Sequence, residues 1–128
     1  MTTDTDRLKQ GEANRRRVLG DAHVDRSLKS RTEFNGEWVD FITRTAWGDV
    51  WNRPGLDYKS RSIIVLSVAT ALGRWEEFRI HVKGALNNGL TKDEIKEVLM
   101  QCAVYAGVPA ANTAFNEAQR VFDEVAKD

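Results

Sequence analysis

The sequence predicts an all-α fold, a compact bundle of about six helices. Apolar residues recur at intervals of three and four along most of the chain, which is the spacing of a helix with one buried face. Thr-Lys-Asp-Glu at 91–94 forms a capping box, which marks a helix start. Glycines follow several of these segments, where a left-handed cap ends a helix. No segment has the convincing pattern of a β-strand.

Length and composition favour one domain covering residues 1–128, with the polar residues 1–5 flexible. A chain of this size buries roughly two thirds of the surface that its unfolded form exposes, so it needs no cross-links. Basic and acidic residues number 19 each, and this zero net charge gives no support to nucleic acid as a partner. Residues 1–32 hold eight basic and five acidic groups, net +3, which is compatible with subunit contacts.

The protein is expected in the cytoplasm. The chain has no charged-then-apolar leader, and its longest uncharged run, Ser62–Gly73, is too short to span a bilayer. The single cysteine, Cys102, excludes an internal disulfide and an intramolecular dithiol redox cycle.

The N-terminal part is predicted to contain two helices. The first runs from Asp6 to about Leu19 and ends at Gly20. LGDAHVDR is predicted to be a short connection, with His23 in it. The second helix has an amphipathic spacing of Phe34, Trp38, Phe41, Ile42 and Thr45.

WGDVWNRPGLD, residues 47–57, is predicted to be a loop because it holds two glycines and a proline. Its two tryptophans must pack on something or help to form a pocket or an interface. Asp57 can cap the next helix, Tyr58–Leu72. The stretch IIVLSVATAL in that helix is apolar on nearly every side, so the helix is central or lies between subunits. Its β-branched content would also suit a strand, but its length and its neighbours favour a helix.

Three more helices are predicted in the C-terminal part. The first, Arg74–Asn87, ends at Asn88-Gly89, and the capping box opens the second, which Gly107 stops. Pro109 opens the last helix, at a position that tolerates proline. The apolar faces of the second and third helices are formed by Ile95, Val98, Leu99, Cys102 and Ala106, and by Ala111, Phe115, Ala118, Phe122 and Val125.

A His–Glu pair on Arg74–Asn87 is the first chemical candidate. At about 100° per residue, His81 borders the apolar stripe of this helix and Glu77 lies just beyond it. The carboxylate can accept a hydrogen bond from one ring nitrogen and leave the other for a substrate, as acid–base catalysis requires. The alternative is an ordinary surface contact between residues four apart.

Long stretches of the chain resemble a known family. RRRVLGDAHVDRS, AWGDVWNRPGLD and SRSIIVLSVATALGRWEEFRIHVKGALNNGLTKDEIKEVLMQCAVYAGVPAANTAF are similar to the carboxymuconolactone decarboxylase family, whose relatives include the alkylhydroperoxidase D-like proteins. The resemblance covers about residues 15–125. The E-x-x-x-H helix, N-G-x-T-x-x-E-I and Y-x-G-x-P are family-wide, whereas VLGDAHVD and WGDVWNRPGL look more specific to the decarboxylases.

The resemblance implies an alkylhydroperoxidase D-like fold that forms homo-oligomers, commonly trimers or hexamers. It also implies loss of CO2 from 4-carboxymuconolactone to give 3-oxoadipate enol-lactone, without a cofactor, in the protocatechuate branch of the β-ketoadipate pathway. The peroxidase relatives carry C-x-x-C just before such a histidine. Arg74 and Glu77 take those two positions here, so their peroxidase mechanism is excluded. Cys102 is expected to be a buried small hydrophobe.

The implied substrate suggests roles for single residues. His81 would donate a proton to carbon and stabilise the dienolate, with Glu77 orienting it. Arg61 would bind the carboxylate that stays, and its alternative is a capping or interface salt bridge. The other substrate-binding candidates each have a structural alternative: packing or subunit contact for Arg53 and Trp51, a backbone-bonded connector residue for His23, and packing for Tyr105.

Two other functions fit the same residues. One is an enzyme that acts on a related lactone, because a histidine and a glutamate do not choose among such substrates. The other is a non-catalytic helical oligomeric binding module, in which His81 and Glu77 would be fully exposed. A metal site is not predicted, because the two histidines are far apart and give no recognisable ligand spacing.

Overall fold

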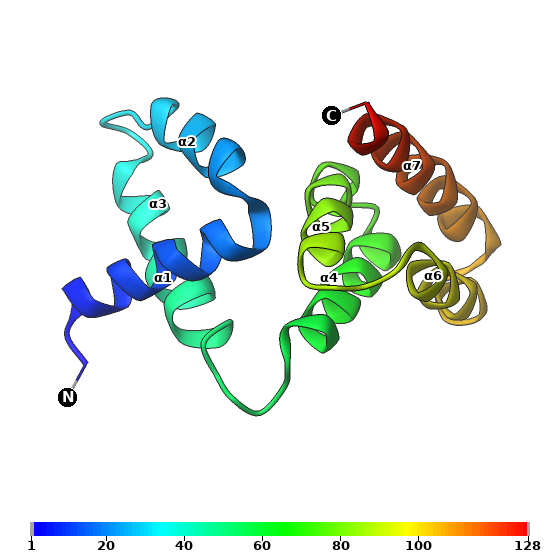
Figure 1. The fold of residues 1–128 in the computed structure, drawn as a ribbon, viewed down its shortest axis with the longest axis horizontal. Coiled ribbons are helices and arrows are strands. Elements are labelled where there is room, and N and C mark those ends of the chain that lie inside the picture. The colour runs from blue at the N-terminus through cyan, green and yellow to red at the C-terminus, as the bar shows by residue number, and fades with distance from the viewer. Residues whose placement is uncertain (1, 128) are drawn as a thin grey trace. The chain divides into compact units, whose positions relative to one another are not determined.

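The structure is a computed structural model that describes residues 2–127 (Figure 1). Within this range the chain is helical and contains no strand, which confirms the all-α prediction. The described residues form seven α-helices and one π-helical segment, rather than about six helices. They are α1 (Asp4–Leu19), α2 (Asp21–Lys29), α3 (Gly36–Ile42), η1 (Thr43–Val50), α4 (Tyr58–Leu72), α5 (Trp75–Asn87), α6 (Lys92–Ala106) and α7 (Val108–Ala126).

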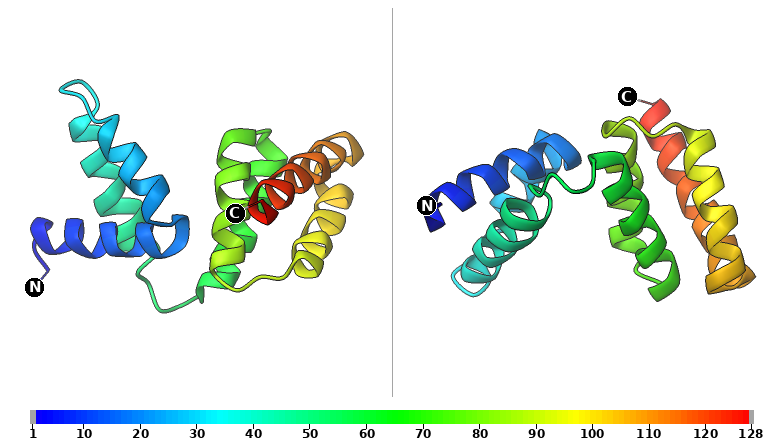
Figure 2. Two further views of the ribbon diagram at one scale, coloured as in Figure 1. Left: turned by 45° about the horizontal axis from the view of Figure 1, so that its top comes forward. Right: turned by 90° about the horizontal axis from the view of Figure 1, so that it is seen from below.

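The helices of the described residues form two compact units, which divide between Asp57 and Tyr58. In the second unit, α4 and α7 each pack against both α5 and α6 (Figure 2). All four helices contribute to one apolar core, at whose centre Leu66, Phe78, Val82 and Leu99 are almost completely buried. This core fixes the position of α5, which carries the His–Glu pair.

The sequence features of the second unit have the predicted effects. The Thr91 hydroxyl accepts from the Glu94 N–H at 3.0 Å and the Glu94 carboxylate accepts from the Thr91 N–H at 2.9 Å, so the capping box is confirmed. Gly107 ends α6 with a φ of 104°. The predicted faces of α6 and α7 are correct except for Ala106 and Val125, which are exposed in the last turns of their helices.

Helix α4 is less buried than its sequence suggests. Only Ser62, Leu66, Ala69 and Thr70 are buried. The opposite side exposes 48% of Ile64, 50% of Val68 and 62% of Leu72. Since an apolar helix face in water is unfavourable, this side is the place to look for a further partner.

The first unit is organised by a close contact between α1 and η1. A Cβ atom on Gly11 would collide with the carbonyl oxygen of Thr43, and one on Gly48 would collide with the carbonyl oxygen of Arg7. The two backbones therefore touch where neither helix has a side chain. The guanidinium of Arg7 also donates two hydrogen bonds to Asp49, at 3.0 and 2.7 Å.

The predicted connection LGDAHVDR is wrong, because Asp21–Lys29 is helix α2. Gly20, with a φ of 88°, both ends α1 and precedes α2. Arg16 on α1 pairs with Asp21 at 3.1 Å and with Asp25 at 2.9 Å, which ties the two helices at this corner. Val24 is the only buried residue in α2, so the helix has no broad apolar stripe that periodicity could reveal.

The predicted loop at 47–57 is partly wrong, because Trp47–Val50 belongs to η1. The N–H of Trp51 donates to the carbonyl of Ala46, five residues back, at 2.9 Å. The predicted packing of the tryptophans is confirmed, since Trp47 and Trp51 are both 7% exposed and their rings stack at 5.0 Å.

The helix predicted around Phe34–Thr45 exists, but its aromatic face is exposed in this chain. Phe34 lies before the start of α3 and is 98% exposed. Trp38 is 61% and Phe41 49% exposed, and their rings stack at 5.8 Å.

Helix α1 begins at Asp4, earlier than the predicted Asp6. A second capping box stands here: Thr3 accepts from the Asp6 N–H at 3.0 Å, and Asp6 accepts from the Thr3 N–H at 3.2 Å. The flexibility predicted for residues 1–5 includes Met1, which lies outside the described residues. No helix within the described range is long and apolar enough to cross a membrane.

Candidate functional site

The His–Glu pair lies on α5, one turn apart on the same side of the helix. His81 is 6% exposed, beside Phe78, Val82 and Ala85, which are fully buried. Its burial is greater than a position at the border of the stripe would suggest. The Glu77 side chain is 63% exposed. One member of the pair therefore belongs to the protein interior and the other to its surface.

The distance between the two side chains is too long for a hydrogen bond. His81 Nε2 and Glu77 Oε2 are 3.8 Å apart. The contact is within ion-pair range once the imidazole is protonated, but an exposed carboxylate contributes little to such a pair. The expected orienting hydrogen bond is therefore not formed in this structure. The non-catalytic alternative requires both side chains to be fully exposed, and the buried His81 does not meet this requirement.

Arg61, the candidate for binding a carboxylate, lies half-buried on the first turns of α4, which packs against α5. The turn that carries it is bonded to the end of α5. Asn88 Nδ2 donates to Ser62 Oγ at 2.8 Å and lies 3.5 Å from the carbonyl oxygen of Tyr58. The sequence analysis missed this amide, since Asn88 was noted only as part of the helix stop before Gly89.

Tyr105 is 84% exposed in the single chain, so it does not pack among the described residues of that chain. It lies on the rim of a groove of about 430 Å³ between α4 and α6. Cys102, which is buried as predicted, also lines this groove. The other lining residues are Ile63, Ser67, Glu97, Val98 and Gln101.

The remaining candidates belong to the first unit. His23 lies half-buried on α2, so it is a helical residue and not a connector residue. Trp51 is buried in its stack with Trp47, which agrees with the packing alternative. Arg53 is exposed in the 51–57 loop and lines an open polar cavity of about 510 Å³ with Arg7, Asp49 and other residues.

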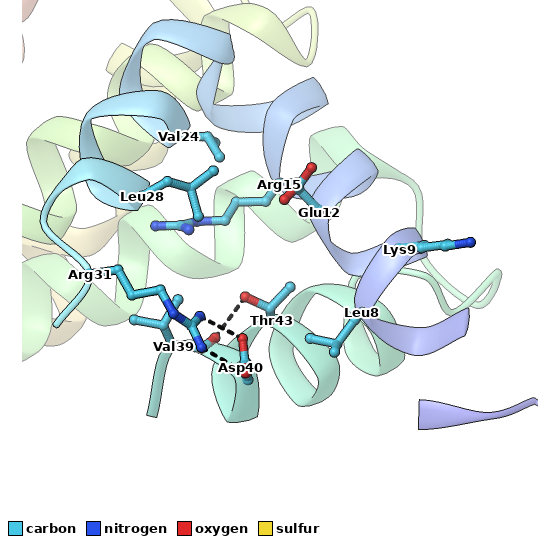
Figure 3. A pocket seen from close by; sticks show the side chains of 10 residues that line it. All are labelled: Leu8, Lys9, Glu12, Arg15, Val24, Leu28, Arg31, Val39, Asp40 and Thr43. Atoms are coloured by element: carbon cyan, nitrogen blue, oxygen red, sulfur yellow. Dashed lines mark hydrogen bonds and ion pairs between the residues drawn. The ribbon is translucent and has the colours of Figure 1, made fainter. Parts of the chain in front are cut away.

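A second cavity of the first unit, about 250 Å³, was not predicted (Figure 3). Figure 3 shows Val24 and Leu28 beside the Arg15 side chain, which donates to Ser27 Oγ at 2.9 Å, and Val39 beside Arg31 and Asp40. Arg31 donates to both oxygens of Asp40, at 2.8 and 3.0 Å, and these bonds hold the pKa of the Asp40 carboxyl below its usual value.

No histidine or cysteine lines this cavity, and the charges of Arg31 and Asp40 are paired with one another. The sequence offered no signal for it, because nine residues separate the two partners. Among residues 2–127 no three side chains of histidine, cysteine, aspartate or glutamate are grouped so that they could hold a metal ion.

Comparisons with known proteins agree with the resemblance that the motifs indicate. Residues 36–120 match the profile of the carboxymuconolactone decarboxylase family. A 4-carboxymuconolactone decarboxylase from Acinetobacter baylyi is 48% identical over 122 residues, which cover 95% of this chain and 91% of that protein. A nitrosuccinic acid decarboxylase from Metarhizium robertsii is 38% identical over 91% of this chain and 81% of its own length.

A shorter match gives the same assignment. A 4-carboxymuconolactone decarboxylase sequence from Pseudomonas putida is 56% identical over 43 residues, 34% of this chain and 90% of that sequence. The family profile covers both the helix with the His–Glu pair and the capping box of α6. The chain therefore belongs to the carboxymuconolactone decarboxylase family.

Proposed function

We propose that this protein converts 4-carboxymuconolactone to 3-oxoadipate enol-lactone and CO2, as a cofactor-independent carboxy-lyase of the β-ketoadipate pathway. The observation that carries the proposal is the 48% identity to a 4-carboxymuconolactone decarboxylase across 95% of this chain. The same proposal places the enzyme in the cytoplasm, in the protocatechuate branch of aromatic catabolism.

The substrate can accept the electrons that CO2 leaves behind. The departing carboxylate is attached to a ring carbon that a C=C bond conjugates to the lactone carbonyl, so the electron pair moves toward that carbonyl as a dienolate. The enzyme must hold the second carboxylate, stabilise the oxyanion and return a proton to carbon. The departing carboxylate is best left in apolar surroundings, because strong binding of the ground state would slow its loss.

In this proposal His81 donates the proton and stabilises the dienolate. Its burial supports this role, because an imidazole shielded from water interacts more strongly with a developing oxyanion. Glu77 lies on the Nε2 side of the ring, from where it can orient the imidazole and balance the positive charge of its protonated form. Because Glu77 is exposed and 3.8 Å away, we assign it the smaller contribution.

Arg61 is proposed to bind the carboxylate that stays, because a guanidinium can donate two parallel hydrogen bonds to it. Its support is its place on α4, the helix that packs against α5. Arg53, Trp51 and His23 from the first unit and Tyr105 from α6 are kept as substrate-binding candidates. The buried stack of Trp51 favours a structural role for that residue.

The second relative points to the same requirements. Nitrosuccinic acid, the compound named for the Metarhizium protein, also carries two carboxyl groups and an electron-accepting group, the nitro group. Loss of one carboxylate would leave a charge on nitro oxygens in place of a lactone oxygen. A related lactone or another activated dicarboxylate therefore remains the alternative substrate class, and the rank order of kcat/KM among such compounds separates the possibilities.

We also propose that the protein is a homo-oligomer, a trimer or a hexamer. The exposed apolar side of α4 supports this, since it continues onto α6 through the groove lined by Ile63 and Tyr105. A stable interface buries on the order of 800 Å² on each partner. Light scattering on the purified protein gives the subunit number, and an Ile64→Glu variant is expected to lower it.

The proposed activity is tested with an assay in which the substrate is generated in the reaction mixture. A cycloisomerase generates 4-carboxymuconolactone from 3-carboxymuconate, the purified protein is added, and NMR follows enol-lactone formation together with CO2 release. Turnover that is lost in a folded His81→Ala variant supports both the reaction and the proton donor. Turnover that persists in this variant moves the acid to another residue, with His23 next. A folded oligomer without turnover would overturn the proposed reaction.

A further inference from the structure

We infer that Asn88 is a positioning residue that sets the place of Arg61 relative to His81. The inference rests on the proposed function, because it gives Asn88 a role only through the carboxylate-binding role of Arg61. It starts from an amide whose bonds join the two helices that carry the proposed chemistry.

The first step is the local geometry. Asn88 directly follows α5, and its side chain reaches α4 through Nδ2, which donates to Ser62 Oγ at 2.8 Å. The same nitrogen lies 3.5 Å from the carbonyl oxygen of Tyr58. A carbonyl can only accept, so this neighbour fixes the amide nitrogen, and not the amide oxygen, on this side.

The second step is the position of Arg61 relative to these two contacts. Tyr58 and Ser62 are four apart, one helical turn, and Arg61 lies between them. Asn88 itself follows His81 by seven residues, about two turns along α5. The Asn88 side chain thus connects, by hydrogen bonds, the turn of α4 that holds Arg61 to the helix that holds His81. In this inference the separation of Arg61 and His81 depends on these hydrogen bonds.

The third step is that the hydrogen bond from Asn88 to Ser62 is not an incidental contact at the protein surface. Ser62 is completely buried, so its hydroxyl depends on partners inside the protein. Asn88 Oδ1 is also buried, and it accepts no hydrogen bond from the residues that the structure describes. The amide therefore still has one acceptor to offer at this junction.

The experiment measures KM and kcat for 4-carboxymuconolactone with Asn88→Ala, Asn88→Asp and Ser62→Ala. Asn88→Ala and Ser62→Ala remove the same bond from opposite ends, so each is expected to raise KM about tenfold, as for a loss of about 1.4 kcal/mol. We expect kcat to change less than KM. The double variant should be no worse than either single one, because both lose one interaction. Asn116→Ala, an exposed asparagine on α7, is the matched control and should leave both constants unchanged.

Asn88→Asp separates positioning from mere structural support. It keeps the shape of the side chain but places a carboxylate beside the turn of Arg61, where it would compete with the carboxylate of the substrate. Its KM should exceed that of Asn88→Ala and should fall as salt is added. If Asn88→Ala does not fold, Ser62→Ala carries the test, because alanine fills the buried space of serine closely.

The outcomes are distinct. Wild-type protein without turnover overturns the proposed function and this inference together. Wild-type turnover with unchanged KM in folded Ser62→Ala and Asn88→Asp overturns the inference alone. A fall in melting temperature with no change in KM has the same meaning, since it assigns Asn88 to stability only.

Discussion

The two units of the molecule are built in different ways. Residues 58–127 pack four helices around one apolar core, and in that core Phe78, Leu66 and Val82 have no exposed surface. Residues 2–57 rely on backbone contact at Gly11 and Gly48 and on arginine–carboxylate pairs between helices. The second unit depends mainly on side-chain volume. The first unit also buries apolar side chains such as Val24 and Trp47, but its helices are joined in addition by glycine contacts and charge pairs. Substitutions of core side chains should therefore destabilise the second unit more. Substitutions of the contact glycines or of the paired charges should destabilise the first unit more.

The largest expected effect compares the two histidines, one from each unit. His81→Ala should lower kcat by about a hundredfold to ten-thousandfold, the usual contribution of a general acid. His23→Ala on α2 should change kcat by less than about tenfold. Steady-state rates of both variants, with circular dichroism as the control for folding, check this. An effect of His23→Ala as large as that of His81→Ala would contradict the assignment of the chemistry to the second unit.

The next largest effect compares buried side chains. Phe78→Ala should destabilise the second unit by about 3–5 kcal/mol, because it leaves a cavity in a dense core. Val24→Ala in the first unit should cost about 2 kcal/mol, in proportion to the two methyl groups lost. Urea unfolding gives the free energies, and hydrogen exchange assigns them to residues. Equal losses from the two variants would show that the first unit also depends on an apolar core.

Gly11→Ala tests the backbone contact. Alanine normally favours a helix over glycine by about 1 kcal/mol, yet here its Cβ would collide with the carbonyl of Thr43, so we expect a net destabilisation of about 1–3 kcal/mol. Gly55→Ala is the control, since a Cβ there meets nothing within 4 Å. The melting temperature should therefore fall more for Gly11→Ala than for Gly55→Ala. A Gly11→Ala protein that is more stable than wild type would rule out the close contact.

The two capping boxes allow the same change in each unit. Thr3→Ala removes the cap of α1 and Thr91→Ala removes the cap of α6, each worth about 1 kcal/mol. Thermal melts of the single and double variants check both values, which should add because the sites belong to different units.

The smallest effect is the acid response of the first unit. Hydrogen bonds from Arg7 lower the pKa of Asp49, and hydrogen bonds from Arg31 lower the pKa of Asp40. A carboxyl whose folded pKa is depressed stabilises the fold above its unfolded pKa, about 3.9. This stability is lost as the pH falls through the folded pKa. Between about pH 5 and 3, the protection from hydrogen exchange, measured against the intrinsic exchange rate at each pH, should therefore fall first in residues 2–57.

Asp49→Asn is the control for that experiment. It keeps the shape of the side chain, removes the charge and should abolish the part of the acid response that the Arg7 pair contributes. Salt should weaken the same pair, because both partners are partly exposed to solvent. Protection that falls equally in both units would mean that these carboxylates do not determine the response.

The same difference explains what the sequence could predict. The second unit has apolar residues at helical spacing and a glycine or a capping box at its boundaries, so its helices were located almost to the residue. In the first unit, α2 shows only Val24 to the interior and η1 begins inside an apparent amphipathic helix. Its partners, such as Arg7 and Asp49, are 42 residues apart, and no local pattern reveals such pairs.

The candidate site divides in a similar way. The neighbourhood of His81 and Glu77 follows from helical periodicity, and their four-residue spacing was visible in the sequence. Their 3.8 Å separation was not, because it depends on how far a surface carboxylate turns toward a buried ring. The link from Asn88 to Ser62 was also invisible, since 26 residues separate two polar side chains that meet only when α4 packs against α5.

The π-helical segment Thr43–Val50 has a consequence for comparisons among relatives. Its backbone hydrogen bonds span one residue more than those of an α-helix, as the bond from Trp51 to Ala46 shows. A relative that forms an ordinary α-helix here could therefore reach the same loop with one residue fewer. An alignment gap of a single residue between 43 and 50 would then mark a change of helix type, with the loop and the fold beyond it left intact.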